Sequence, residues 1–98
     1  MIIEKKYPKN NEIFRLIDND KESTIGPFEI FYDFESDGKL SKIPHSYRCW
    51  FCECHNYPDQ IENNIVYSLV KTPIGEKDIY KCRVCNHLGY KQDKIYGG

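Results

Sequence analysis

Alternating apolar and polar residues predict β-strands in the first half of the chain. In residues 28–35, aromatic or branched side chains occupy the even positions and mostly acidic side chains the odd ones. Because successive side chains of a strand point to opposite faces, this stretch predicts a strand with one apolar and one largely acidic face. The apolar run 13–17 predicts an earlier strand, which ends at the turn-forming sequence Asp18-Asn19-Asp20.

A hairpin is predicted after residues 28–35. Asp37-Gly38 is a strong hairpin signal, because glycine adopts a positive φ without steric cost. Residues 39–43 are expected to return alongside, and Pro44 is expected to end the returning strand. Residues 1–46 are therefore expected to form a β-hairpin region whose aromatic side chains pack for stability.

A second hairpin signal lies in the other half of the chain. Residues 64–71 are rich in β-branched and aromatic residues, residues 72–75 break the pattern, and residues 78–81 resume it. Residues 56–62 are expected to form a loop or one helical turn, with Pro58 at an early helical position. The sequence therefore predicts one domain over residues 1–98, divided into regions 1–46 and 47–98, that is mainly β, with small antiparallel sheets and little helix.

Length and cysteine content predict that this fold needs a metal ion or a disulfide to stabilise it. A chain of 98 residues buries only about 60–65% of its unfolded surface, so its core is marginal. No apolar run is long enough to span a bilayer, and the first residues lack the pattern of a secretory signal, which predicts a reducing cytoplasm. In that compartment, closely spaced cysteines are more often metal ligands than disulfides.

Two Cys-x-x-Cys pairs are the strongest chemical signal. Cys49 and Cys52 form the first pair, and Cys82 and Cys85 form the second. This spacing lets the backbone turn so that both sulfurs face one ion, and two such turns supply a tetrahedral set of thiolates for Zn²⁺. A site closed by four protein ligands leaves no position for water or substrate, so a structural Zn²⁺ is predicted.

Cys54 and His55 leave the ligand set open. Both follow closely on the first pair, and either could replace one of the four cysteines. Disulfides, iron or a redox-active thiol pair are further alternatives. Asn86, after the second pair, tolerates the left-handed backbone often needed there, whereas Glu53, after the first pair, is less suited to it. The second turn is therefore expected to be the more regular one.

Residues 47–91 resemble the zinc-ribbon group with rubredoxin-like knuckles. The resemblance rests on the two Cys-x-x-Cys motifs, the hairpin between them, and a third short strand at about residues 87–91. The chain departs from the usual pattern because it lacks glycine after each second cysteine and carries Cys54 and His55. The resemblance implies a zinc-ribbon-like fold for region 47–98 and a structural metal, but no single function, since zinc ribbons occur in transcription, translation, replication and adaptor proteins.

The charge balance argues against nonspecific binding to duplex DNA or RNA. The formal net charge is -1, and four thiolates around one divalent ion make it more negative. We therefore expect a small non-catalytic module that binds and modulates another macromolecule, with a protein as the favoured partner. The expected contact residues are the basic and aromatic ones around the second cysteine pair: Lys81, Arg83, Tyr90, Lys91 and Lys94.

Three other functions stay open from the sequence. The same basic and aromatic mixture would suit a zinc ribbon that binds single-stranded nucleic acid. The terminal Gly97-Gly98 is similar to the ends of carrier proteins and conjugated tags. The stretch Cys82-Arg83-Val84-Cys85-Asn86-His87 resembles the second of the two Cys-x-x-Cys braces of His-Asn-His nucleases, although the catalytic Asp-His pair between the braces is incomplete. The bias toward Ile, Lys, Asn and Tyr is typical of AT-rich coding sequence, which favours a viral or accessory protein that modulates a host enzyme.

Overall fold

Strands dominate the architecture. The computed structural model describes residues 1–97, together with the side chains of residues 1–92. The elements of these residues are, in chain order, β1 (Ile2–Tyr7), β2 (Asn10–Asp18), β3 (Lys21–Phe34), β4 (Leu40–Arg48), β5 (His55–Asn56), α1 (Pro58–Glu62), β6 (Ile65–Thr72), β7 (Gly75–Lys81) and β8 (Leu88–Gly97). The prediction of a mainly β fold with little helix is confirmed.

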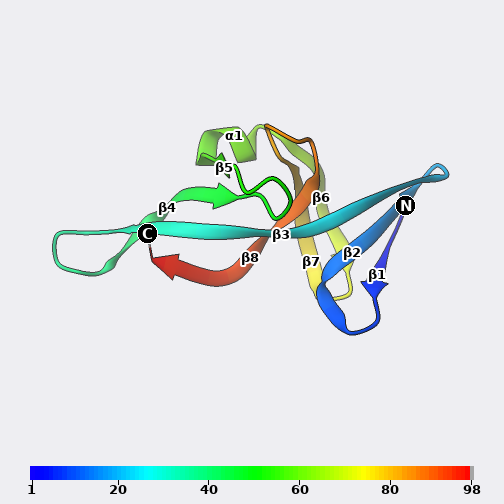
Figure 1. Cartoon of the computed structure of the whole chain (residues 1–98), viewed down its shortest axis with the longest axis horizontal. Helices are drawn as coiled ribbons and strands as arrows, with labels where there is room; N and C mark the ends of the chain where they lie inside the picture. The colour runs from blue at the N-terminus through cyan, green and yellow to red at the C-terminus, as the bar shows by residue number, and fades with distance from the viewer. Residues whose placement is uncertain (98) are drawn as a thin grey trace.

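All eight strands belong to one sheet, in the order β1-β2-β3-β8-β7-β6, with β4 paired to β3 and β5 to β4. The long strand β3 pairs with β2 along its first half and with β4 along its second half, while its opposite edge pairs with β8 (Figure 1). The β3–β8 pair is parallel, and the other described pairs are antiparallel. The sheet is therefore mixed and continuous, because β8 joins region 47–98 to region 1–46.

Two hydrophobic cores lie on opposite faces of this sheet. Ile79 and Tyr80 are neighbours on β7 and belong to different cores, and successive side chains of a strand point to opposite faces. The first core contains Phe14, Leu16, Ile25, Ile79 and Tyr90. The second core contains Phe28, Tyr47, Cys49, Ile61, Tyr80 and Cys82. The ends of the sheet curl around the first core, so that β1 contacts β6.

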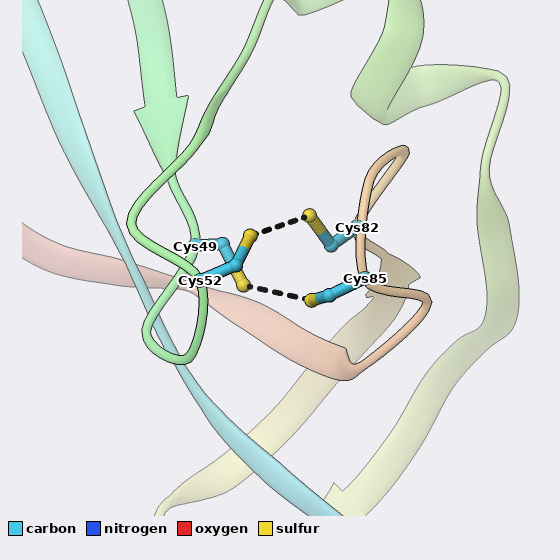
Figure 2. Close-up of side chains that lie close together, drawn as sticks. All are labelled: Cys49, Cys52, Cys82 and Cys85. Carbon is cyan, nitrogen blue, oxygen red and sulfur yellow. Dashed lines mark hydrogen bonds between the residues drawn. The ribbon is translucent and has the colours of Figure 1, made fainter.

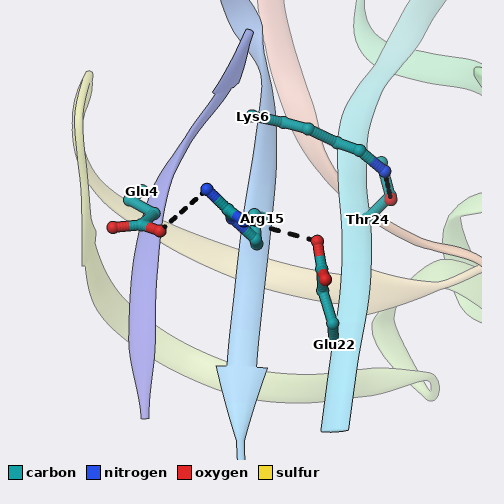
Figure 3. A network of polar contacts seen from close by, with 5 residues as sticks. All are labelled: Glu4, Lys6, Arg15, Glu22 and Thr24. Carbon is teal, nitrogen blue, oxygen red and sulfur yellow. Dashed lines mark hydrogen bonds and ion pairs between the residues drawn. The ribbon is translucent and has the colours of Figure 1, made fainter.

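The face of β1–β3 opposite the first core carries a network of polar contacts (Figure 3). Nη2 of Arg15 lies 3.1 Å from Oε1 of Glu4, and its Nε lies 3.8 Å from Oε1 of Glu22. Nζ of Lys6 donates a hydrogen bond of 2.7 Å to Oγ1 of Thr24. Exposed ion pairs of this kind contribute about 0–1 kcal/mol each, so burial of the first core, not this network, stabilises this end of the molecule.

The outer parts of β3 and β4 extend beyond both cores as an arm, which we define as residues 31–45 (Figure 1). The arm turns at Gly38, whose φ of 85° confirms the predicted hairpin. The prediction that Pro44 ends the returning strand is wrong, because β4 continues to Arg48. Register shifts flank Tyr32, the partner of Pro44, and such an irregularity tolerates the missing N–H of proline.

The second hairpin and the single helix form where the sequence predicts them. The predicted hairpin over residues 64–81 is formed by β6 and β7, and the predicted helical turn is α1, which begins at Pro58. Strand β1 has no counterpart among the predicted strands, because Glu4, Lys5 and Lys6 hide its alternation. No helix among the described residues is long and apolar enough to cross a membrane.

Candidate metal centre

Four cysteine side chains converge between two turns that are far apart in the sequence (Figure 2). Cys49 and Cys52 lie between β4 and β5, and Cys82 and Cys85 lie between β7 and β8. The Sγ atoms of these four residues all lie within 4.8 Å of one another. The Sγ atoms are 3.6 Å apart both in the pair Cys49–Cys85 and in the pair Cys52–Cys82. Sulfurs around a tetrahedral Zn²⁺ at 2.3 Å are about 3.8 Å apart, so these cysteines are positioned to hold a metal ion, which is compatible with a zinc-ribbon-like site.

The two turns share the same backbone hydrogen bonds. In the first turn, the Cys49 N–H donates to the Cys54 carbonyl at 3.0 Å, and the Glu53 N–H donates to the Cys49 carbonyl at 3.1 Å. In the second turn, Cys82 and Asn86 donate the corresponding bonds, at 2.9 and 3.1 Å. Each turn therefore presents its two sulfurs to the same side.

Both turns also require a left-handed backbone after the second cysteine. Glu53 has a φ of 62° and Asn86 a φ of 64°. The expectation that the second turn is the more regular one is wrong, because the first turn has the same bonds and the same backbone conformation. A left-handed conformation costs about 1–2 kcal/mol at a residue other than glycine, and less at asparagine. Glu53 therefore carries backbone strain that its turn imposes.

This strain predicts a stabilising substitution. Glu53→Gly is expected to raise the free energy of unfolding by about 1 kcal/mol, because glycine adopts the left-handed conformation without steric cost. Asn86→Gly is the matched control in the other turn, and its effect is expected to be within about 0.5 kcal/mol of zero. Urea unfolding of the metal-loaded proteins measures both values. A destabilising Glu53→Gly would contradict the left-handed assignment of the first turn.

Burial and N–H donors set the ionisation of the ligand thiols. Burial raises the pKa of the thiols of Cys49 and Cys85. Burial also acts to raise the pKa of Cys82, but the backbone N–H groups of Cys85 and Val84 and the side chain of Asn56 outweigh it and lower the pKa to about 6. Metal binding requires deprotonated thiols, so the hydrogen-bond donors around Cys82 act in the direction that favours ligation.

Cys54 and His55 lie outside the four-sulfur cluster. Nδ1 of His55 lies 2.7 Å from Oγ of Ser46, and its ring packs on Phe31 with the centroids 5.4 Å apart. The carbonyl of Cys54 closes the first turn, and a hydrogen bond with the side chain of Cys52 raises the pKa of its thiol. The structure therefore brings the four predicted ligands together and leaves both alternative ligands out.

Two of the expected contact residues are engaged within the protein. Tyr90 is only 3% exposed, in the first core. Nζ of Lys91 forms an ion pair with Glu62 and lies 4.9 and 5.1 Å from the ring centroids of Tyr47 and Tyr80. Burial acts to lower the pKa of Lys91, but the Glu62 contact outweighs it and raises the pKa. The side chains of Tyr90 and Lys91 are therefore both engaged in contacts within the protein.

The other expected contact residues are Lys81, Arg83 and Lys94. Lys81 is exposed, and Nε of Arg83 donates to the His55 carbonyl at 3.0 Å. The side chain of Lys94 and residue Gly98 lie outside the described part of the chain, while Gly97 is the last residue of β8. The ring of His87, which belongs to the nuclease alternative, stacks on Phe51 with the centroids 3.8 Å apart.

Two residues around the cluster have no signal in the sequence. Nε1 of Trp50 donates to the Leu88 carbonyl at 2.7 Å, which fixes the first turn against β8. Asn56 is fully buried beside Cys82. Only their nearness to the Cys-x-x-Cys motifs could have indicated them.

Comparisons with protein-family models, curated proteins and solved structures found no significant match, so the assignment of this site rests on the geometry of its own residues.

Proposed function

We propose that this protein is a non-catalytic module. One structural Zn²⁺ links its two cysteine turns, and its surface binds another protein. The four-sulfur cluster carries this proposal. An all-sulfur tetrahedral set favours Zn²⁺ over oxygen-preferring ions such as Mg²⁺ and Ca²⁺. Zn²⁺ with four protein ligands has no coordination position left for substrate or water, so its role is to stabilise the fold.

The arm is the proposed binding surface. We define the arm surface as Tyr32, Phe34, Leu40 and Ile43. Phe34 is 58% exposed and Ile43 is 71% exposed, well beyond both cores. Tyr32 and Leu40 line a hollow of about 280 Å³ with Ser41 and Lys42. Large apolar side chains exposed on a protruding element are typical of a protein-binding surface.

Charge favours a protein over a nucleic acid as the partner. Three acidic residues, Asp33, Glu35 and Asp37, and two lysines, Lys39 and Lys42, are exposed on the same arm, so that acidic groups outnumber basic ones there. Carboxylates beside a contact surface repel phosphates, whereas they complement lysines and arginines around an apolar groove. The proposed partner is therefore a protein with an apolar groove and a basic rim, and a bacterial enzyme that an accessory or viral protein modulates would suit this description.

Substitutions on the arm are expected to weaken partner binding without changing the stability of the fold. The Phe34→Ser/Ile43→Ser protein is expected to lose at least about tenfold in partner capture from a lysate of a low-GC bacterium, because two exposed apolar contacts are removed. Its thermal midpoint is expected to stay near the wild-type value, since surface substitutions rarely change stability by more than about 0.5 kcal/mol. Ile65→Ser/Leu69→Ser on β6 is the control, because these apolar side chains are also exposed, at 43% and 65%.

The expected result is one protein retained stoichiometrically by the wild type and by the β6 control but not by the arm variant. Equal retention by the arm variant would contradict the arm surface. Retention of no protein, together with salt-sensitive binding of a single-stranded oligonucleotide, would contradict the protein-binding proposal in favour of nucleic acid.

A further inference from the structure

A buried amide lies between the two cysteine turns. Asn56 forms β5 with His55, directly after the first turn, and it is 0% exposed. Asparagine is seldom fully buried unless its polar atoms are hydrogen-bonded. The partners of this side chain therefore indicate why an amide occupies the position.

The orientation of the Asn56 amide is fixed by the second turn. Oδ1 accepts a hydrogen bond of 2.8 Å from the backbone N–H of Arg83, a group that can only donate. Nδ2 must then lie on the other side, where Cys82 Sγ and the Cys54 carbonyl are each 3.5 Å away. One side chain thus contacts both turns and one of the candidate ligand sulfurs.

This contact breaks the symmetry of the two turns. In each turn, the residue two positions after the first cysteine directs its N–H toward that cysteine's sulfur, Phe51 toward Cys49 at 3.4 Å and Val84 toward Cys82 at 3.5 Å. Among the described side chains, an amide donor is added only at Cys82, by Asn56. An additional N–H donor stabilises a thiolate, because a hydrogen bond to a charged acceptor is stronger than one to a neutral acceptor.

We infer that Asn56 is a positioning residue of the metal centre, whose Nδ2 donor holds the Cys82 thiolate while its Oδ1 fixes the second turn against the first. This inference rests on the proposed metal site. Residues that orient metal ligands through hydrogen bonds typically change metal affinity by about 10–100-fold when they are replaced. The same donor withdraws electron density from the sulfur, so its removal is expected to change the electronic spectrum of a bound ion as well as its affinity.

Two substitutions separate the donor from the acceptor. Asn56→Asp keeps an oxygen for the Arg83 N–H but removes the donor and places a carboxylate beside the thiolate. Asn56→Leu removes both functions and keeps the number and branching of the side-chain heavy atoms, although the leucine side chain is larger. Asn63→Asp is the matched control, because it adds the same charge at an exposed position seven residues further along the chain. Co²⁺ is the probe, because its sulfur-to-metal charge-transfer band reports the ligand sulfurs directly, and a competing chelator gives its affinity.

Both Asn56 variants are expected to bind Co²⁺ about 10–100-fold more weakly than the wild type, with the charge-transfer band shifted to lower energy. The Asn63→Asp protein is expected to match the wild type in both readouts. Spectra at saturating Co²⁺ keep the test valid for a variant that is unfolded without metal. If Asn56→Asp retains wild-type affinity and band energy, the amide acts only through Arg83 and the inference is wrong. Failure of the wild type itself to bind Co²⁺ would instead contradict the metal centre.

Discussion

Removal of the metal is expected to unfold the second half of the chain. Cys49 and Cys82 are 1% and 0% exposed and belong to the second core, so the ion would join two turns and a core at one point. Structural Zn²⁺ contributes an apparent binding free energy of about 10–16 kcal/mol, which is comparable with the whole stability of a small domain, about 5–15 kcal/mol. Addition of a strong chelator should therefore abolish the dispersed NMR signals of residues 47–91.

Two cysteine substitutions test this prediction, one in the cluster and one outside it as the control. Cys82→Ser is expected to lose the metal and the same NMR signals, because the cluster loses one of its four sulfurs. Cys54→Ser is expected to keep one metal ion per chain and wild-type stability, because Cys54 lies outside the cluster. Loss of the metal in the Cys54→Ser protein would place that residue in the ligand set and contradict the geometry.

Gly26→Ala is expected to give the second-largest effect, a loss of about 3 kcal/mol in the free energy of unfolding. A Cβ atom at Gly26 would lie 2.3 Å from a ring carbon of Trp50. The ring has little freedom to move away, because its Nε1 is bonded to the Leu88 carbonyl and it lies within the first cysteine turn. The substitution therefore strains β3 and the metal centre together, and thermal or urea unfolding of the loaded protein measures the loss.

A double substitution identifies the cause of that loss. Trp50→Ala removes the ring that the new methyl group would meet, so Gly26→Ala is expected to cost less than about 1 kcal/mol in the Trp50→Ala background. Additive losses in the double variant would show that the ring is not the obstacle. Unchanged stability in the single Gly26→Ala variant would contradict the close packing of Trp50 on β3.

The features that the sequence predicted correctly are local. The spacing within Cys49-x-x-Cys52 and Cys82-x-x-Cys85 limits each pair to a tight turn, so the motif favours these four ligands, whereas the geometry was needed to leave out Cys54 and His55. The breaks at residues 36–38 and 72–75 likewise mark hairpins through backbone conformation. For Pro58, the fixed φ of proline suits the first turn of a helix. None of these predictions required knowledge of distant contacts.

The features that the sequence did not predict depend on contacts between distant segments. Gly26 pairs with Gly89 across the parallel strands β3 and β8, and a Cβ at Gly89 would lie 2.8 Å from the Gly26 carbonyl oxygen. Glycine within a strand indicates a close approach of another backbone, but the signal does not say which segment approaches. Lys91 is a similar case. The sequence pattern assigns this side chain to the surface, but it forms an ion pair with Glu62 and lies over two tyrosine rings.

Metal content and thiol reactivity of the purified, reduced protein test the central claim most directly. Native mass spectrometry should find one Zn²⁺ per folded chain, and alkylation of this form should modify Cys54 while Cys49, Cys52, Cys82 and Cys85 stay protected. A metal-free protein that is fully folded, or one in which all five cysteines react at the same rate, would contradict the account.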